Sequence, residues 1–365
     1  MKVGTGGARA APISFKGRGA AHNPQGRFEH QVRESFDDGW TGAADEAATP
    51  RTEVTLIQAR SIISRNESPD LPFTQSINPY QGCEHGCIYC YARPSHAYLG
   101  LSPGLDFETK LFAKANAAEL LRAELSRPGY RCEVISIGAN TDPYQPIERK
   151  HAITRSVLEV LAECNHPLGI ITKSALIERD LDLLAPMAKK GLVQVFISIG
   201  TVDRELMRRL EPRSVAPERR LEVLRTLSDA GVPCGVLVAP IIPFLNDRDM
   251  EAVLERAATQ GAQMAGHQTL RLPYELKNLF KDWLERHYPL KAGHIMSQIR
   301  QMRGGRENDP RFGKRMSGEG IFAELQEQRF RLACERYGLN RDGRNRQLDT
   351  THFLPPFGTG QLNLF

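Results

Sequence analysis

Cys83, Cys87 and Cys90 lie within eight residues of one another in the stretch NPYQGCEHGCIYCYARPSHAYLG, with the spacing CxxxCxxC. Thiolates bind metals, and the glycines and polar residues around these three do not suit a buried, inert trio. A structural zinc ion normally takes four protein ligands, so His85 or His96 would have to complete the site. A four-iron cluster held by three thiolates would instead keep one iron open to another ligand. The spacing alone leaves both interpretations open.

The rest of the chain has the composition of an ordinary globular protein. Of its 365 residues, 41% are hydrophobic and 25% are charged, which is enough for a large core without disulfides. The remaining cysteines, Cys132, Cys164, Cys234 and Cys334, are scattered singly, which indicates a reducing cytoplasm. No secretory signal or apolar run long enough to cross a bilayer is evident, so we expect a cytoplasmic protein without membrane contact.

Apolar runs and amphipathic stretches alternate from Thr52 onward. A weak strand is expected around Phe73 to Pro79, just before the cysteines, and a helix from about Phe112 to Leu125. Strands buried on both faces are predicted by four runs rich in β-branched residues, at 133–139, 168–174, 193–200 and 234–241. Repeated strand, helix, strand order means parallel pairing with right-handed crossovers. We therefore predict an α/β fold, an open or partial barrel of about six units, with its site at the carboxyl ends of the strands.

A three-cysteine loop after the first strand of such a barrel, with Tyr89 before the last cysteine, resembles the radical S-adenosylmethionine (SAM) superfamily. The segments INPYQGCEHGCIYCYAR, TDPYQPIE, TKS and LEPR, between about Ser76 and Tyr274, resemble its spore photoproduct lyase-like branch, including a poorly characterised bacterial group. The resemblance implies a partial (β/α)6 barrel of radical SAM type and a [4Fe–4S] cluster held by the three cysteines. It also implies that SAM chelates the open iron and is cleaved reductively to a 5′-deoxyadenosyl radical, with an external electron donor.

Other predicted strand ends supply groups that suit SAM, which carries an ammonium, a carboxylate, hydroxyls and an adenine. Asp142 can accept from the ammonium, and Lys173, costly to bury without an anion, suits the carboxylate. Asp-Pro is also ordinary turn chemistry, and Lys173 could reach solvent along its stem. The resemblance adds Glu211 and Arg213, which would equally suit a solvated ion pair. The full set of candidate cofactor-binding residues is Tyr89, Asn140, Thr141, Asp142, Lys173, Ser174, Ser198, Glu211 and Arg213.

The hydrogen-atom donor departs from the family pattern. Spore photoproduct lyases place a donating cysteine at the end of the second strand, just before a Thr-x-Asp sequence, where this chain has Ala139. Cys132 lies near the start of that strand, which at about 3.3 Å per residue is toward the opposite end of the barrel. Another donor is therefore needed. Tyr144 and Tyr98 are the candidate catalytic residues, although each also suits a packed aromatic with a solvated hydroxyl.

The substrate is predicted from charge. The formal net charge is +5, the excess of basic residues falls mainly between Ile299 and Leu348, and the first 28 residues contain no acid. Clustered arginines neutralise phosphates, so we favour nucleic acid, DNA in particular, as the target of repair or modification. RGGRENDPRFGKR could equally be a solvated loop. The alternatives are modification of RNA or a peptide side chain, and a non-enzymatic zinc or iron–sulfur module that binds nucleic acid.

The predicted organisation has four parts. They are a disordered basic arm at 1–50, the barrel at 51–275, a helical basic extension at 276–340 and an extended tail at 341–365. The tail ends in QLNLF, which resembles the Gln-Leu-x-Leu-Phe motif that binds the bacterial sliding clamp. Gln361, Leu362, Leu364 and Phe365 would engage the clamp, with the last two filling an apolar cleft. The alternative is that these apolar residues fold back onto the chain's own domain.

Overall fold

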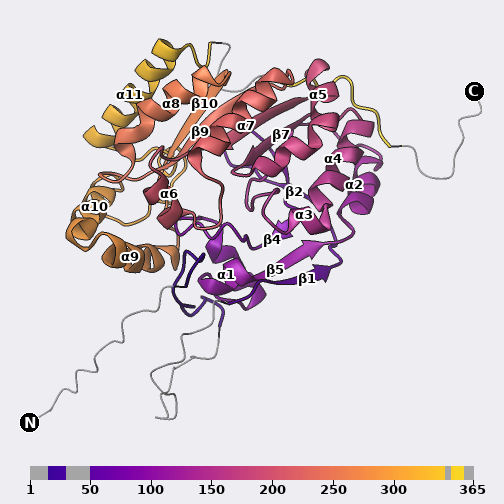
Figure 1. The fold of residues 1–365 in the computed structure, drawn as a ribbon. Helices are drawn as coiled ribbons and strands as arrows, with labels where there is room; N and C mark the ends of the chain where they lie inside the picture. The colour runs from indigo at the N-terminus through magenta and orange to yellow at the C-terminus, as the bar shows by residue number, and fades with distance from the viewer. Residues whose placement is uncertain (1–14, 30–49, 342–346, 357–365) are drawn as a thin grey trace, which may run out of the picture.

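The protein is described from a computed structural model that covers residues 15–29, 50–341 and 347–356 (Figure 1). QLNLF and most of the predicted basic arm lie outside these residues. None of the helices in the described part is both long and apolar enough to cross a membrane.

A seven-stranded sheet forms the centre of the molecule, in the order β10-β9-β8-β7-β6-β3-β2. All pairs from β3 to β10 are parallel, and β2 pairs antiparallel with β3 at the edge. The strands are β2 (Ile63–Arg65), β3 (Gln75–Ile77), β6 (Ile135–Ile137), β7 (Leu168–Thr172), β8 (Val193–Ser198), β9 (Cys234–Ile241) and β10 (Met264–Thr269). Six consecutive parallel strands confirm the predicted partial barrel.

Helices cover the outer face of this curved sheet (Figure 1). They are α2 (Ala117–Leu125), α3 (Glu148–His151), α4 (Ile153–Glu163), α5 (Leu181–Lys189), α7 (Pro217–Asp229), α8 (Met250–Thr259) and α11 (Ile321–Tyr337), with short 3-10 turns at η2 (Ala175–Asp180) and η3 (Asp247–Asp249). The short helix α6 (Arg204–Leu210), which follows β8, packs instead with Phe280 and Trp283. Most apolar residues predicted for the strands are fully buried, including Ile137, Ile170 and Val195, whereas Ile171 and Phe196 are partly exposed. Burial on both faces explains why these strands read as unbroken apolar runs.

A second, three-stranded sheet lies beside the cysteine loop, in the order β1-β5-β4. Its strands are β1 (Glu53–Ile57), β4 (Tyr80–Gln81) and β5 (Lys110–Lys114). Between β4 and β5 the chain forms η1 (Arg93–Leu99) and α1 (Leu105–Thr109). The helix expected from Phe112 begins only at Ala117, and Phe112 lies in β5. The sequence KLFAK alternates in burial and pairs with β1 along its whole length, so tertiary pairing overrides the helical pattern there.

The C-terminal helices α9 (Leu276–His287) and α10 (Pro289–Gln301) form a separate apolar cluster with the cysteine loop. Phe280, Trp283 and Ile295 pack there with Ile88 and Cys87, and all but Cys87 are fully buried. The Trp283 indole donates to the carbonyl of Arg209 (3.1 Å), which fixes α9 against α6. The basic C-terminal extension is therefore part of the structure that holds the cysteines.

Residues 15–29 of the predicted arm pack over the cysteine loop. The Glu108 carboxylate accepts from the amides of Gly19 (3.0 Å) and Ala20 (2.9 Å) and pairs with Arg93 (2.5 Å). Both charged side chains are completely buried. A Cβ on Gly19 would stand 1.9 Å from the carbonyl oxygen of Gly86, so only glycine allows this approach. The pair Glu108 and Arg93 therefore fastens the N-terminal segment to the loop.

Replacing Glu108 by Leu should lower the free energy of unfolding by about 3 to 5 kcal/mol, because the buried Arg93 guanidinium loses its counter-charge and the amides of Gly19 and Ala20 lose their acceptor. Urea unfolding followed by circular dichroism measures the change. Glu163→Leu, which breaks an exposed pair with Arg122, is the control and should cost at most about 1 kcal/mol. Equal losses in the two variants would contradict the role given to Glu108.

Candidate active site

The cysteine loop leaves β4 and is shaped by two glycines with left-handed backbone, Gly82 (φ 77°) and Gly86 (φ 67°). A Cβ on Gly86 would stand 2.8 Å from the carboxylate of Glu108, so a side chain has no room there. The amide of Cys83 donates to the carbonyl of Phe107 (2.9 Å), and the amide of Ile88 to that of Leu210 (3.0 Å). The loop is therefore bound on one side by α1 and on the other by α6.

Three thiols lie together on this loop. Cys83 and Cys87 are each 7% exposed and Cys90 is half-buried. Cys83 and Cys90 pack in a small cluster with Phe107, and Cys87 packs in the cluster of α9 and α10. A zinc ion on these thiols would need a fourth protein ligand, whereas a four-iron cluster would keep one iron open to another ligand.

Neither histidine proposed as a fourth zinc ligand is available for that role. His96 is fully buried with its Nε2 2.9 Å from the carbonyl oxygen of Lys110, and burial lowers its pKa. The Nδ1 of His85 lies 3.4 Å from Oδ2 of Asp142. Burial opposes the charge of His85, but Asp142 and Cys83 raise its pKa to about 10. His85 therefore stands as a cation between a carboxylate and a thiol.

Asp142 connects the ends of two strands to the cysteine loop. Its Oδ1 accepts from the Thr172 hydroxyl (2.7 Å), and its Oδ2 accepts from the Lys173 amide (2.8 Å) and faces His85. Burial alone would raise the pKa of this carboxyl, but His85 and Lys173 hold it well below its usual value. Asp142, the predicted acceptor for the SAM ammonium, thus already accepts hydrogen bonds from protein groups. These contacts position Thr172, Lys173 and His85.

Asn140 and Thr141 follow β6 at the same end of the sheet. Their amides share the side-chain oxygen of Asn78 (2.9 and 3.4 Å), and the Thr141 hydroxyl donates to the carbonyl of Tyr80 (2.9 Å). Among the described residues, the side chain of Asn140 has no hydrogen-bond partner. Of the two, only Asn140 has its side chain free to bind a ligand.

A second buried network lies at the ends of β7 and β8. The Glu211 carboxylate accepts from the Tyr89 hydroxyl through one oxygen and from Arg220 through the other. Arg220 is fully buried and also donates to the carbonyl of Ser198 (2.8 Å). Nothing in the sequence singled out Arg220, since it reads as one of several charges on an amphipathic helix, α7.

Lys173 lies between these two networks. Burial opposes its charge, but Cys87, Glu211 and Asp142 raise the pKa of Lys173 above its usual value. Within the part of the chain that the structure describes, its ammonium group donates no hydrogen bond. A charged donor without a partner, next to the cysteine loop, is suited to bind an anionic group of a ligand.

The remaining candidates for the cofactor site have partners elsewhere. Arg213 pairs with Glu84 (3.2 Å) on the cysteine loop, and the Ser174 hydroxyl accepts from the amide of Leu176 (3.2 Å) to cap η2. Their placement fixes the walls around Lys173.

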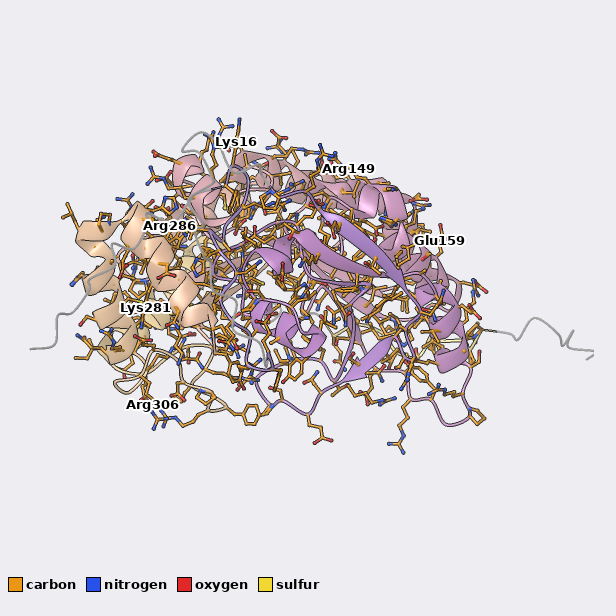
Figure 2. All side chains as sticks on the ribbon, turned by 90° about the horizontal axis from the view of Figure 1, so that it is seen from below. Lys16, Arg149, Glu159, Lys281, Arg286 and Arg306 are labelled. Atoms are coloured by element: carbon orange, nitrogen blue, oxygen red, sulfur yellow. The ribbon has the colours of Figure 1, made fainter. Side chains whose placement is uncertain are left out.

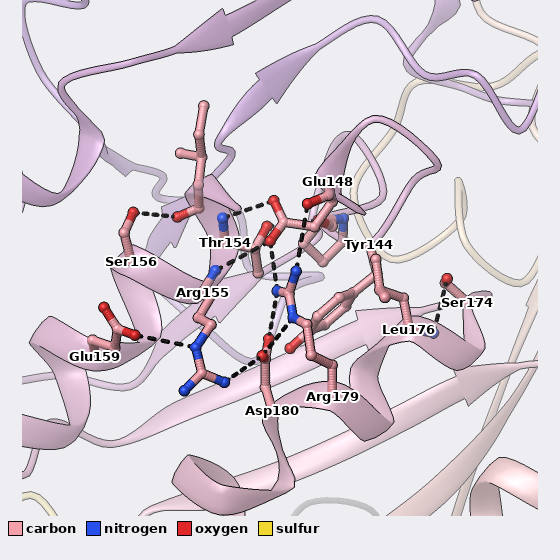
Figure 3. A network of polar contacts seen from close by, with 12 residues as sticks. Tyr144, Glu148, Thr154, Arg155, Ser156, Glu159, Ser174, Leu176, Arg179 and Asp180 are labelled. Atoms are coloured by element: carbon pink, nitrogen blue, oxygen red, sulfur yellow. Dashed lines mark hydrogen bonds and ion pairs between the residues drawn. The ribbon is translucent and has the colours of Figure 1, made fainter. Parts of the chain in front are cut away.

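The structure does not bring the two candidate catalytic tyrosines to the cysteine loop. Tyr98 is 72% exposed, and its ring lies 5.1 Å from that of Phe28. Tyr144 is fully buried in the main core, where its hydroxyl faces Asp180 within an ion-pair network that includes Glu148 and Arg179 (Figure 3).

Tyr91, which directly follows the last cysteine, was missed from the sequence although its neighbour Tyr89 was noted. Its ring is 42% exposed, and its hydroxyl donates to the carbonyl of Ala139, the position of the missing cysteine. The guanidinium of Arg271, after β10, lies 5.5 Å from the centre of this ring. Tyr91 therefore connects the cysteine loop to the chain that follows β6 and to the chain that follows β10.

Comparison with known proteins agrees with this arrangement. The family model of the radical SAM superfamily matches residues 77–257. The chain belongs to the radical SAM superfamily. The superfamily implies a [4Fe–4S] cluster and SAM.

Curated relatives and solved structures extend the comparison. An uncharacterized protein of Mycobacterium tuberculosis, Rv2578c, is 38% identical over 234 residues, which cover 64% of this chain and 68% of the relative. MJ0683 of Methanocaldococcus jannaschii, also uncharacterized, is 29% identical over 197 residues, 54% of this chain and 71% of the relative. Spore photoproduct lyase complexed with dinucleoside spore photoproduct superposes with a TM-score of 0.55 at 18% identity, over 78% of this chain and 80% of that one. This superposition shows a shared fold.

Cys87→Ser should reduce the iron and sulfide bound after anaerobic reconstitution and abolish formation of 5′-deoxyadenosine from SAM and dithionite, because one iron loses its thiolate. Iron, sulfide and zinc analysis with chromatography of the products measures both effects. Cys132→Ser, a half-buried cysteine away from the loop, is the control and should behave as wild type. Stoichiometric zinc without a brown chromophore in the wild type would contradict the assignment.

Proposed function

We propose that this radical SAM enzyme binds its cluster through Cys83, Cys87 and Cys90 and acts on DNA, in repair or modification. The cluster assignment is carried by the CxxxCxxC loop of a radical SAM domain, where Cys83 and Cys87 are buried and Cys90 is half-buried and neither neighbouring histidine is free to act as a fourth ligand. When bound, the cluster and SAM supply a 5′-deoxyadenosyl radical by one-electron cleavage of the sulfonium, with the electron from an external donor.

The chain's own residues position SAM in this proposal. Lys173 offers its free ammonium group to the carboxylate, and Asn140 offers its free amide. Asp142 and Glu211 hold these walls through their hydrogen bonds. The supporting walls are completed by Tyr89, Thr141, Ser174, Ser198 and Arg213. Two buried carboxylates thus hold the residues on either side of Lys173, close enough to Cys87 for their charges to interact.

Tyr91 is the hydrogen-atom donor that the geometry favours. Tyr144 is enclosed in the core and Tyr98 lies on the outer surface, whereas Tyr91 adjoins Cys90 and is partly exposed. Its hydroxyl is at the backbone of Ala139, where spore photoproduct lyases place a cysteine. A phenol here would give a substrate radical access to a hydrogen atom from the same strand end.

DNA is supported as the substrate by two observations. The fold is shared with a lyase whose structure was solved with a dinucleoside photoproduct, and the basic extension includes α9 and α10, which pack with the cysteine loop. All seven cysteines are free, which suits a reducing cytoplasm. RNA or a peptide side chain is the second candidate, since an arginine-rich surface also fits these anionic partners.

Formation of 5′-deoxyadenosine should be faster with ultraviolet-irradiated or undamaged duplex DNA than without nucleic acid, because substrate commits the radical to productive transfer. Binding of the same duplex should weaken with salt, with a slope of about −0.9 in log K per log salt for each phosphate neutralised. Fluorescence anisotropy at several salt concentrations measures this, with RNA of the same sequence as the control. Absent or salt-independent binding, with SAM cleavage intact, would contradict a DNA substrate and favour a peptide.

We also propose that QLNLF recruits a sliding clamp. These residues lie outside the described part, but the chain leads to them from Pro356, whose carbonyl accepts from the Ser126 hydroxyl (2.9 Å) next to α2. This attachment is on the outer helical layer, whereas the cysteine loop lies beside α1 and α6 (Figure 1). The last described residue before the tail is thus held beside α2 and not beside the cysteine loop.

Replacing Leu364 and Phe365 by Ala should reduce binding of the full-length protein to purified clamp at least tenfold, because both apolar anchors are lost. Asn363→Ala, at the variable position of the motif, is the matched control and should bind as wild type. Surface plasmon resonance measures both. Equal affinity of all three proteins, or no binding by any, would refute the clamp proposal without touching the radical chemistry.

A further inference from the structure

The loop between α10 and α11, residues 302–320, spans the gap between the two edges of the main sheet. At one edge, the amide of Thr269 at the end of β10 donates to the carbonyl of Met316 (2.9 Å). At the other edge, Asp70 in the β2–β3 connection accepts from the amide of Gly313 (2.6 Å) and from Arg315 (2.5 Å). The loop is thus fixed at both ends across the open side of the barrel.

Acidic residues hold this loop in one conformation by pairing with part of its arginines. Asp309 binds Arg311 through both oxygens (2.6 and 3.0 Å), and Glu319 lies 3.2 Å from the same guanidinium. Glu307 pairs with Lys281 (2.6 Å) on α9. These carboxylates are therefore neutralised within the loop and its supports, and they do not screen the cations that remain unpaired.

Phe312, Lys314 and Arg306 are the side chains that this framework leaves free. Phe312 is 59% exposed at the tip, next to Gly313, and its ring lies 4.6 Å from the guanidinium carbon of Arg315 beneath it. Lys314 and Arg306 are exposed and form no ion pair within the described residues. Figure 2 shows Arg306 projecting outward from the rim of the molecule. Phe312 thus presents an exposed aromatic face at a tip anchored to Asp70, beside cations that form no ion pair among the described residues.

The same loop adjoins the entrance to the candidate active site. Arg303 is fully buried and donates to the carbonyl of Leu270 (2.8 Å), which fixes the start of the loop against the chain that carries Arg271. The Nε of Arg271 is buried without a hydrogen-bond partner, and its guanidinium faces the ring of Tyr91. A ligand that reaches Tyr91 from the open side of the barrel therefore passes Arg271 and the loop.

We propose that Phe312 stacks on an unstacked base of the nucleic-acid substrate while Lys314 and Arg306 neutralise the adjacent phosphates. This inference rests on the proposed DNA substrate and assigns the contact to a particular loop. Every base presents a face to an aromatic ring, so stacking tolerates any sequence, and flanking cations supply the charge-driven part of the affinity. Arg271, whose Nη1 donates to Sδ of Met316 (3.8 Å) and whose Nε has no partner, would receive the phosphate nearest Tyr91.

The test compares Phe312→Leu with Phe312→Trp in the otherwise intact, reconstituted protein. A labelled DNA duplex with one unpaired base is the probe, and anisotropy gives its affinity. Phe312→Leu should weaken binding by about 5-fold to 100-fold, whereas Phe312→Trp should retain it, because stacking needs an aromatic face and not apolar bulk. Thermal unfolding should be unchanged in both, since the ring is exposed.

Lys314→Ala tests the electrostatic half of the contact. It should lower affinity for all sequences alike and reduce the salt slope by about one. Lys189→Ala, on the distant outer helix α5, is the matched charge control and should leave both quantities unchanged. Wild-type affinity in Phe312→Leu and Lys314→Ala, with salt-dependent DNA binding preserved, would overturn this inference and leave the DNA proposal standing. A wild-type protein that cleaves SAM but binds no DNA would overturn both.

Discussion

The carboxylate of Asp142 is the contact on which the arrangement of the site depends. It lies just after β6, binds the hydroxyl and amide groups at the end of β7, and faces His85 on the cysteine loop. Three segments that are far apart in the chain thus share one buried anion. The resulting charge balance also reaches Lys173, whose ammonium group is kept charged by this carboxylate together with Glu211 and Cys87. A polar junction of this kind tolerates little displacement, because any partner left alone would be buried without compensation.

Apolar packing also holds the cysteine loop in place. Cys87 and Ile88 pack with α6, α9 and α10, so the loop that carries the thiols is half enclosed by the C-terminal extension. Arg220 and Glu211 attach the other half to β8 through the carbonyl of Ser198. The extension therefore serves both as part of the scaffold of the site and, through its connecting loop, as the rim that a large substrate would meet.

Much of this fold could be predicted from the sequence because fully buried parallel strands leave continuous apolar runs. The cysteine loop could be predicted because Cys83, Cys87 and Cys90 occur in a short polar segment directly after a predicted strand. The helical spacing of Leu120, Leu121 and Leu125 predicts a helix, but not where it begins. Phe112 lies in β5 because that segment pairs with β1. The sequence predicts Asp142 and Lys173 at strand ends, and the structure confirms these positions. The sequence does not show that the Asp142 carboxylate already accepts hydrogen bonds from Thr172 and Lys173. Arg220 and the Nε of Arg271 are buried, and this burial marks them as parts of the site. The burial of an arginine cannot be recognised from its place in the sequence.

The packing of residues 15–29 over the cysteine loop has a consequence for access to the thiols. The backbone of Gly19 lies so close to Gly86 that a Cβ on Gly19 would stand 1.9 Å from the Gly86 carbonyl oxygen. This contact depends on Glu108, whose carboxylate accepts from the amides of Gly19 and Ala20. Approach to the loop from that side is therefore closed while the segment is in place, and detaching the segment would open it.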